Sequence, residues 1–227
     1  MKQVIKNIKL FAIGSTLALA SVGASADVIE LITNGEFEDP QITGSFQFVS
    51  DTNVPGWACT NGQCEIWAQG AIGSPSLGSD GLATGQHHEI NASNIFSITT
   101  NGGLVAVDSI GSLTFDVWDR IGQGALRFMI DAIGPNARNI FTSSIVDLSD
   151  LGANNAWYQL GANNLTLLAG DQIKVSFLDL TFRSDCDTCG VHIDGVRMTA
   201  TSVSEPGTLA LFGLALLGLG ITRRRKA

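Results

Sequence analysis

The four cysteines stand in two close pairs, Cys59 with Cys64 and Cys186 with Cys189. Thiols at such spacing can form disulfides, exchange electrons with other thiols, or bind zinc. Two aspartates flank Cys186 and disfavour the thiolate that redox exchange needs, and the uneven spacing disfavours a four-cysteine zinc site. Four cysteines allow three disulfide pairings. In an oxidising compartment we predict the local ones, Cys59–Cys64 and Cys186–Cys189.

The three histidines offer little for catalysis. His87 and His88 are adjacent, so on a strand their side chains would point to opposite faces, and His192 is distant in sequence. The chain has no Gly-x-Ser-x-Gly elbow, His-Glu-x-x-His helix or phosphate-binding loop. A pair of carboxylates for glycoside hydrolysis stays open as an alternative, because acidic residues abound. We predict that the chain is not an enzyme.

Tryptophans beside polar side chains are suited to binding a sugar. Asp116, Trp118 and Arg120 alternate along the chain, so on a strand they share one face. Trp67 and the neighbours Trp157 and Tyr158 are further candidates for an aromatic platform. The alternative is that each tryptophan fills the core or covers a sheet edge. The ligand-binding residues that we predict are Trp67, Asp116, Trp118 and Arg120.

Short strands must position these side chains. Apolar and polar residues alternate over residues 112–120, 125–131 and 172–182, and stretches rich in Gly, Asn, Ser and Thr separate such runs. No long helical pattern and no internal repeat interrupts them. Many short strands with regular turn signals predict an all-β fold, a single β-sandwich or jelly roll.

The charge of the chain is concentrated in its central part. The formal net charge of the whole chain is −8. Residues 27–203 hold six basic and 20 acidic residues, which gives this part a net charge of −14. Such a surface repels phosphate backbones, so we predict no nucleic-acid partner. The same residues are numerous enough for one domain with its own core.

The first 26 residues have the three parts of a secretory signal peptide. Three lysines precede a short apolar stretch, residues 11–22, and Ala24-Ser25-Ala26 provides small residues for cleavage by signal peptidase. The apolar stretch is too short to span a bilayer comfortably. We expect the mature chain to begin at Asp27 and to fold in an oxidising compartment.

The last 24 residues, 204–227, carry a second targeting pattern. Ser204-Glu205-Pro206 precedes an apolar run over residues 209–221. As a helix, residues 206–222 would measure ~26 Å, just short of a hydrocarbon core of ~30 Å. Basic residues follow and would stay on the cytoplasmic side. We predict a short transmembrane helix that ends in Arg223, Arg224, Arg225 and Lys226.

This tripartite layout resembles the PEP-CTERM sorting signal, with Ser204 at the place where the first proline is usual. The resemblance implies recognition by an exosortase in Gram-negative bacteria that make extracellular polysaccharide. It therefore implies export, a transient anchor in the inner membrane, and delivery to the cell surface or the extracellular matrix. Whether the mature protein is attached or released stays open.

Three segments of the central part resemble galactose-binding-like jelly rolls, a superfamily that includes many carbohydrate-binding modules. The opening strand of that fold resembles residues 31–40, its Pro-Gly-Trp loop resembles residues 54–57 with 64–67, and its closing strand resembles residues 191–200. The resemblance implies a jelly-roll β-sandwich over residues 27–203. It does not specify a ligand, because one fold hosts many functions.

The same resemblance implies a structural calcium ion where the first and last strands meet. The matching positions are Glu38 and Asp194, which Asp185 and Asp187 could assist. Calcium takes six to eight oxygen ligands, largely carboxylate and carbonyl. The alternative is that both carboxylates are solvated or cap turns. No organic cofactor is expected.

Three functions are compatible with these patterns. The first is a module that binds an extracellular polysaccharide, and it is the one we favour. The second is a structural protein of the matrix or biofilm without a specific ligand, whose acidic surface holds cations. The third, and least favoured, is an enzyme that acts on polysaccharide.

Overall fold

The structure is a computed structural model that describes residues 26–78, 85–90, 97–121, 123–152, 156–180 and 190–203. The predicted sorting signal, the predicted signal peptide up to Ser25, and the pair Cys186 and Cys189 lie outside these residues. Within the described part, no helix has the length and apolar character needed to cross a membrane. One compact unit comprises Val28–Thr201. In the other unit, the Asp27 amide donates to the Ser202 hydroxyl at 3.0 Å.

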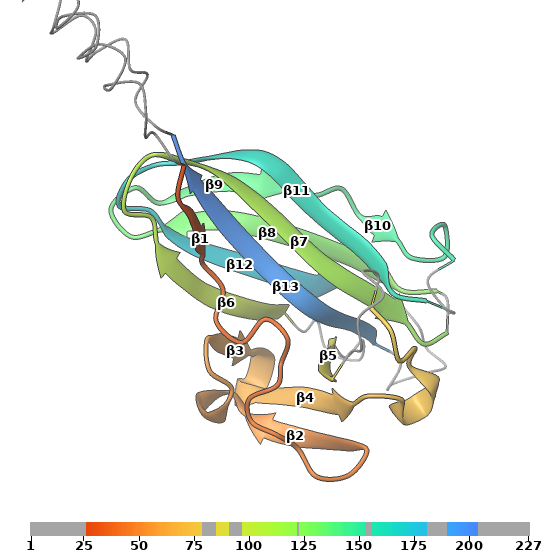
Figure 1. Ribbon diagram of the computed structural model, residues 1–227. Helices are drawn as coiled ribbons and strands as arrows, with labels where there is room; N and C mark the ends of the chain where they lie inside the picture. The colour runs from red at the N-terminus through yellow and green to blue at the C-terminus, as the bar shows by residue number, and fades with distance from the viewer. Residues whose placement is uncertain are drawn as a thin grey trace, which may run out of the picture. The chain divides into compact units, whose positions relative to one another are not determined.

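Two β-sheets make up the compact unit (Figure 1). Sheet A has seven strands, in the order β11-β7-β13-β5-β4-β2 with β1 beside β13; sheet B has six, in the order β10-β8-β12-β6-β3 with β9 beside β8. The strands of sheet A are β1 (Val28–Glu30), β2 (Phe46–Ser50), β4 (Gln63–Ala68), β5 (Gln86–Ile90), β7 (Ser109–Asp119), β11 (Tyr158–Leu167) and β13 (Val191–Ser202). Those of sheet B are β3 (Trp57–Cys59), β6 (Ser97–Leu104), β8 (Ala125–Ile133), β9 (Arg138–Thr142), β10 (Val146–Asp147) and β12 (Gln172–Asp179).

The helical segments among the described residues are three short 3₁₀ turns, Asp51–Asn53, Thr60–Gly62 and Ala71–Gly73. The predicted all-β sandwich is therefore confirmed. The three alternating runs form the strands β7, β8 and β12, each within a few residues of the predicted bounds.

Alternation along the strands gives each sheet one apolar face. In β8, every second side chain is buried, and the antiparallel register places Phe128 opposite Phe177 and Ile130 opposite Val175 of β12. Side chains of paired strands at the same register point to the same face. The two strands thus present one continuous apolar surface to sheet A.

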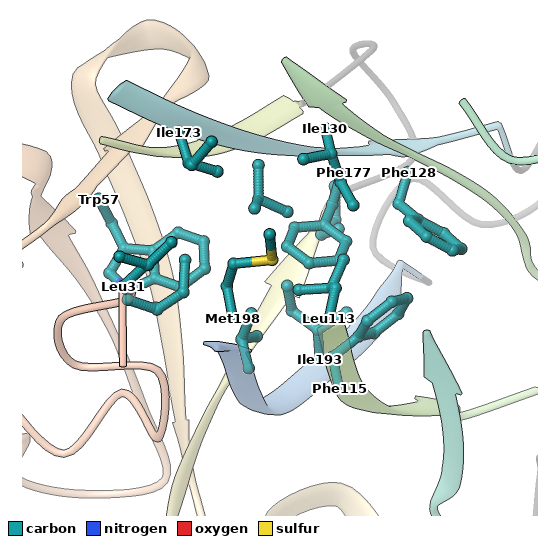
Figure 2. Packing of buried hydrophobic residues seen from close by; sticks show 14 of the residues in the cluster. Leu31, Trp57, Leu113, Phe115, Phe128, Ile130, Ile173, Phe177, Ile193 and Met198 are labelled. Carbon is teal, nitrogen blue, oxygen red and sulfur yellow. The ribbon is translucent and has the colours of Figure 1, made fainter. Parts of the chain in front are cut away.

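Aromatic rings join the two sheets across the core (Figure 2). Phe115 of β7 in sheet A lies between Phe128 and Phe177 of sheet B, with ring centroids 5.0 and 4.8 Å away in edge-to-face arrangements. All three rings are buried. Truncating one such ring to alanine typically costs 3–5 kcal/mol, or roughly a third of a domain's stability.

The opening segment differs from the sequence prediction. The first strand, β1, is Val28–Glu30, and residues 31–40 follow it as an irregular segment. Gly35 explains why this segment stays close to sheet A, since a Cβ there would overlap the Val196 carbonyl of β13. The Val196 amide donates to the Gly35 carbonyl at 3.0 Å. The segment is therefore held by its backbone, without extending β1.

The first and last strands do pair, as the family resemblance implies. Val28, Ile29 and Glu30 of β1 lie opposite Thr201, Ala200 and Thr199 of β13. The Glu30 carboxylate accepts from the Met198 amide at 2.9 Å. This pairing fixes where the segment that carries Glu38 begins relative to β13.

The Pro-Gly-Trp loop packs against the opening segment. Trp57 stacks near Phe37, with centroids 4.7 Å apart, and its indole N–H donates to the Asn34 carbonyl at 2.9 Å. Phe37 is fully buried although its φ of 50° is unusual for a residue other than glycine. Burial of both rings offsets the cost of this backbone conformation.

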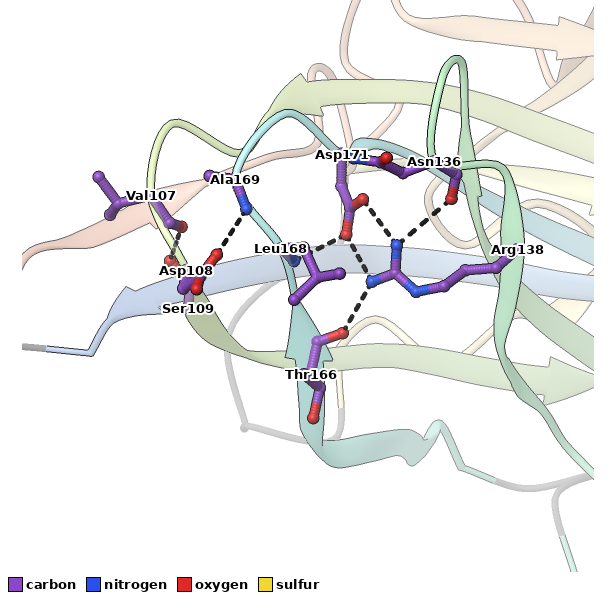
Figure 3. Close-up of polar contacts among 9 residues, drawn as sticks. All are labelled: Val107, Asp108, Ser109, Asn136, Arg138, Thr166, Leu168, Ala169 and Asp171. Carbon is purple, nitrogen blue, oxygen red and sulfur yellow. Dashed lines mark hydrogen bonds and ion pairs between the residues drawn. The ribbon is translucent and has the colours of Figure 1, made fainter.

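A buried ion pair closes the opposite end of the unit (Figure 3). Asp171, in the turn between β11 and β12, accepts both Arg138 guanidinium N–H groups at 2.7 and 2.6 Å and the Leu168 amide at 2.8 Å. The Asp171 side chain is fully buried, and the arginine bonds hold the pKa of its carboxyl below the usual value. This carboxylate has a full set of donors.

Candidate functional site

The outer face of sheet A, which points away from the core, carries the polar and aromatic side chains of the candidate site. Ile66, Ile193 and Phe115 belong to the core, so their neighbours along β4, β13 and β7 point to the outer face. Both buried and exposed side chains lie on this face. They include Phe46 and Phe48 (β2), Glu65 and Trp67 (β4), His87 and Glu89 (β5), Asp116 and Trp118 (β7), and His192 and Asp194 (β13).

A cluster of buried rings occupies the middle of this face. The imidazoles of His87 and His192 lie with centroids 5.1 Å apart. Trp118 covers His192 at 4.7 Å, and Trp157 lies 5.4 Å from His87. The Trp157 indole N–H donates to the Pro75 carbonyl at 3.0 Å, which holds that ring in place. We call His87, His192, Trp118 and Trp157 the ring cluster.

The two histidines of the ring cluster are fully buried, yet their nitrogens have no hydrogen-bond partner within the part of the chain that the structure describes. Burial lowers the pKa of His87 to about 4 and lowers that of His192 well below 6.5, so both imidazoles are neutral at pH 7. His192 Nε2 lies 3.8 Å from Glu89 Oε2, which is longer than a hydrogen bond.

Glu89 is a buried carboxyl beside this cluster. Its Oε1 accepts the Gly190 amide at 2.7 Å. Burial raises the pKa of Glu89 to about 8, and the negative charge of Glu65, which lies opposite on β4, acts in the same direction. The Gly190 amide, the Arg120 charge and the Trp67 indole N–H act in the opposite direction. At pH 7 this group therefore holds a proton unless a cation replaces it.

His88 points to the other face, as its adjacency to His87 predicts. Its ring lies 5.5 Å from Phe37, and its Nε2 lies 3.3 Å from the Cys59 sulfur. Burial, and then the charge of His87, lower its pKa to about 3. The sequence prediction that His87 and His88 point to opposite faces of a strand is therefore confirmed.

The predicted Cys59–Cys64 disulfide is present and joins the end of β3 to β4. Cys59, Cys64 and His88 are the one group of three metal-ligating side chains found within 4.8 Å of one another among the described residues. Their sulfurs are bonded to each other, so neither is available as a thiolate ligand.

Asp116, Trp118 and Arg120 are the alternating residues that we predict to bind a sugar, and we call them the sugar row. The first two share a face of β7, with Phe115 and Val117 on the opposite face. The row does not lie open to solvent. Trp118 is only 2% exposed and belongs to the ring cluster, and Asp116 is also buried. Arg120 is exposed in the turn that follows β7. Their role in binding stays a prediction.

An exposed aromatic pair that the sequence reasoning missed lies at the edge of the same face. Phe46 and Phe48 on the edge strand β2 are 47% and 54% exposed, and their rings meet edge to face at 5.9 Å. Phe46 stacks on Trp67 at 4.7 Å. We call Phe46, Phe48 and Trp67 the aromatic edge. The spacing of two phenylalanines two residues apart was the signal that could have revealed it.

The two predicted calcium ligands lie near each other but do not form a compact ligand set. Glu38 accepts the Gln86 amide at 2.6 Å and the Gln41 side-chain amide at 2.8 Å. Asp194 is buried, and burial raises the pKa of its carboxyl to about 8; the charges of Glu36, Asp116 and Glu38 act in the same direction. Asp194 is thus a buried carboxyl near other acidic side chains, and no cationic side chain is among the causes that shift its pKa.

Residues 202–226 match the family model of the PEP-CTERM protein-sorting motif. The chain thus carries the signal of an exported protein that is sorted through the membrane. The match begins at the last residue of β13. The predicted sorting residues themselves, Ser204, Glu205, Pro206 and the three arginines, lie outside the described residues.

Comparison with solved structures finds carbohydrate-binding modules. The chain is similar to the C-terminal CBM6 of LamC, a marine laminarinase from Zobellia galactanivorans (TM-score 0.38, 13% identity, 76% of this chain and 99% of that chain). It is also similar to a family 35 carbohydrate-binding module from Clostridium thermocellum (TM-score 0.37, 12% identity, 70% and 100%). A third is CBM35 from Paenibacillus barcinonensis (TM-score 0.36, 14% identity, 70% and 100%).

No curated protein matches the chain. The chain thus combines a match to the PEP-CTERM sorting motif with a β-sandwich body.

Proposed function

We propose that this protein is sorted by an exosortase to the cell surface or the extracellular matrix, where its β-sandwich binds a polysaccharide without catalysis. The observation that carries the binding proposal is the aromatic edge. Phe46 is half-exposed and stacks on the buried Trp67, and Phe48 stands edge to face beside it, so each phenylalanine offers an exposed apolar ring that can contact the C–H face of a sugar. Isolated exposed apolar residues are common, but stacked aromatic groups at one edge are not.

Polar groups for the sugar hydroxyls lie next to this surface. The register places Phe48 opposite Glu65, whose carboxylate neighbours Glu89 across β5. Of the four predicted ligand residues, Trp67 supports Phe46 directly. Asp116 and Trp118 are buried on β7, which β13, β5 and β4 separate from β2, and Arg120 is exposed in the turn that follows β7.

Carbohydrate binding is tested with an array of bacterial extracellular polysaccharides and the full-length protein. We expect Phe46→Ala and Phe48→Ala each to weaken binding by about tenfold, because each loses one stacking contact. Leu104→Ala is the matched control, since Leu104 is also exposed but lies on β6 of sheet B. If both phenylalanine variants bind the polysaccharide as tightly as the wild-type protein does, the aromatic edge is not the binding surface. Absence of binding to any polysaccharide would favour a structural matrix protein.

Sorting is tested separately by intact-mass analysis of the protein from its native host. The match of residues 202–226 to the sorting motif supports removal of the tail. We expect the mature protein to begin at Asp27 and to lack Arg223, Arg224 and Arg225. A surface form that still ends in Ala227 would show that the tail is an ordinary anchor.

A calcium ion is the third part of the proposal. A divalent cation held by Glu38 and Asp194 would offset the burial and the neighbouring negative charges that raise the pKa of Asp194. We expect a chelator to lower the Tm of the full-length protein, and Asp194→Asn to remove most of that response. Asp131→Asn is the control, because Asp131 lies on β8 away from this cluster. A Tm that does not respond to the chelator means that there is no such ion.

A further inference from the structure

The ring cluster and Glu89 place two imidazoles and a carboxylate on adjacent positions of two paired strands. His87 and Glu89 are two residues apart on β5, so their side chains share the outer face. The antiparallel register sets His192 of β13 directly opposite Glu89. Three side chains of metal-ligating type therefore converge from the centre of sheet A, where strands are rigid and positions are well defined.

One ligand-atom distance and one ring separation within this set are close to those around a tetrahedral metal, whereas the three ligand atoms together are more widely spaced. Two ligand atoms on a zinc ion with bonds of ~2.1 Å lie roughly 3.4 Å apart. His192 Nε2 and Glu89 Oε2 lie 3.8 Å apart. Two imidazoles on one such ion have ring centres about 5 Å apart, if each centre lies ~3.2 Å from the metal. The His87 and His192 centroids are 5.1 Å apart.

The polar atoms of the set lack other partners. Both ring nitrogens of His87 and of His192 are buried without a hydrogen bond to any described residue, and so is Glu89 Oε2, although the Trp67 indole N–H lies close enough to lower the pKa of that carboxyl. A buried polar atom without a partner costs roughly 1–3 kcal/mol, so five of them within one cluster are not expected unless something else binds there. Neutral imidazoles are also the form that binds a metal.

The protein orients the carboxylate toward the imidazoles. The Gly190 amide holds Glu89 Oε1 at 2.7 Å, which leaves Oε2 directed at His192. Partners of this kind are what fix a metal-ligating carboxylate. Glu65 lies opposite Glu89 on β4 and brings a second negative charge near the set. The two glutamates supply negative charge for a divalent cation, and Arg120 adds one positive charge near the same set.

We propose that His87, His192 and Glu89 form a binding site for a divalent transition-metal ion of the zinc class. Two imidazole nitrogens and one carboxylate oxygen suit zinc and its neighbours and exclude calcium, which prefers oxygen ligands alone. The three ligand atoms do not all lie within 4.8 Å of one another, so metal binding includes a rotation of the His87 side chain. The site is distinct from the proposed calcium ligands and borders the aromatic edge, because the Trp67 ring lies 6.1 Å from the His192 ring.

The experiment uses full-length protein with its disulfide intact, in mild detergent and with calcium in excess to occupy the other proposed site. Zinc is titrated against a chromophoric chelator, and bound metal is counted by mass spectrometry. Long-range imidazole ¹⁵N spectra then report which histidines bind, because the chain has three in all. We expect one zinc per chain and shifted ring nitrogens for His87 and His192 but not for His88.

Three variants separate this site from its alternatives. We expect His192→Gln and Glu89→Gln each to weaken zinc binding by at least about a hundredfold, since removal of a ligand exceeds the loss caused by its outer partners. His88→Gln is the matched control on the opposite face of β5 and should keep the wild-type affinity. The spectra of the wild-type protein decide the matter even if a variant folds poorly.

The proposal is overturned by any of three results. The first is sub-stoichiometric zinc with no shift of the His87 and His192 nitrogens, which would make ordered water the partner of these atoms. The second is binding that appears only after reduction of Cys59–Cys64 and shifts His88, which would assign the metal to that group. The third is unchanged affinity in both His192→Gln and Glu89→Gln.

Discussion

Asp171 and Glu89 are two buried carboxyl groups that the fold treats in opposite ways. Asp171 accepts three strong hydrogen bonds, two from Arg138 and one from the Leu168 amide, and its pKa is lowered. Glu89 accepts one, from the Gly190 amide, and its pKa is raised to about 8. A carboxylate whose partners are all supplied by the chain stabilises the folded state. One that is left short of partners in a rigid sheet is available to a ligand.

The largest expected effect comes from removing the Asp171 carboxylate, whose hydrogen-bond donors are all supplied by the chain. Asp171→Ala leaves the Arg138 guanidinium and the Leu168 amide without their acceptor, so we expect a loss of about 3 kcal/mol in the free energy of unfolding. Urea unfolding at pH 7 measures it. Asp131→Ala is the control, because Asp131 is bonded to Asn139 near the surface. Equal losses in the two variants would mean that the buried carboxylate is no more important than the exposed one.

A series of unfolding measurements at different pH values tests Glu89, the carboxyl that has fewer donors. Glu89 loses its proton near pH 4.5 in the unfolded chain but near pH 8 in the folded one, so the folded state holds more protons between these values. The free energy of unfolding therefore falls as pH rises across this range. The histidines act in the opposite sense, most strongly below pH 6.5 and less as the pH rises to about 7.5, because the unfolded chain holds the extra protons there. Between pH 6.5 and 8 the two raised carboxyls outweigh the three histidines.

In that window and with a chelator present, we expect each raised carboxyl, Glu89 and Asp194, to reduce the stability by about 1.5 kcal/mol as the pH rises. Glu89→Gln should flatten the profile by its share, whereas Asp171→Asn should not change the slope there. Chemical unfolding at several pH values provides the measurement. A profile that is flat in the wild-type protein would mean that Glu89 is ionised and satisfied.

The smallest effect is expected from a pair that is complete but exposed. Glu36 accepts from Arg197 at 2.9 Å, and their side chains are 49% and 60% exposed. Solvent screens such a pair, so Glu36→Gln should change the free energy of unfolding by less than about 0.5 kcal/mol. Thermal unfolding at low and high salt checks this. A loss comparable to that of Asp171→Ala would show that pairing, and not burial, determines how much an ion pair contributes to the free energy of unfolding.

The sequence alone was sufficient for the periodic parts of the fold. Alternation predicted that Asp116 and Trp118 face away from Phe115 and Val117, and adjacency predicted that His87 and His88 point to opposite faces. The short spacing of Cys59 and Cys64 predicted their disulfide. Each of these inferences uses neighbours a few residues apart, where strand geometry determines the outcome.

The candidate site could not be predicted in the same way, because it depends on strand pairing over long distances. His192 meets Glu89 across 103 residues of sequence by virtue of the β13–β5 register. Burial of Trp118 depends on Trp157, which a bond to Pro75 holds over that face. No local pattern distinguishes such a covered tryptophan from an open platform, so alternation alone could not show that the sugar row is covered.

The position of β13 has a consequence for the order of events during export. β13 is the last described strand along the chain, yet it lies inside sheet A between β7 and β5. If the N-terminal end crosses the membrane first, β2, β4 and β5 can assemble early, and so can β7 with β11, but among the described strands of sheet A it is β13 that joins these two ribbons. The sorting motif begins at residue 202, where β13 ends. We therefore expect sheet A to be completed at about the time when the motif reaches the membrane.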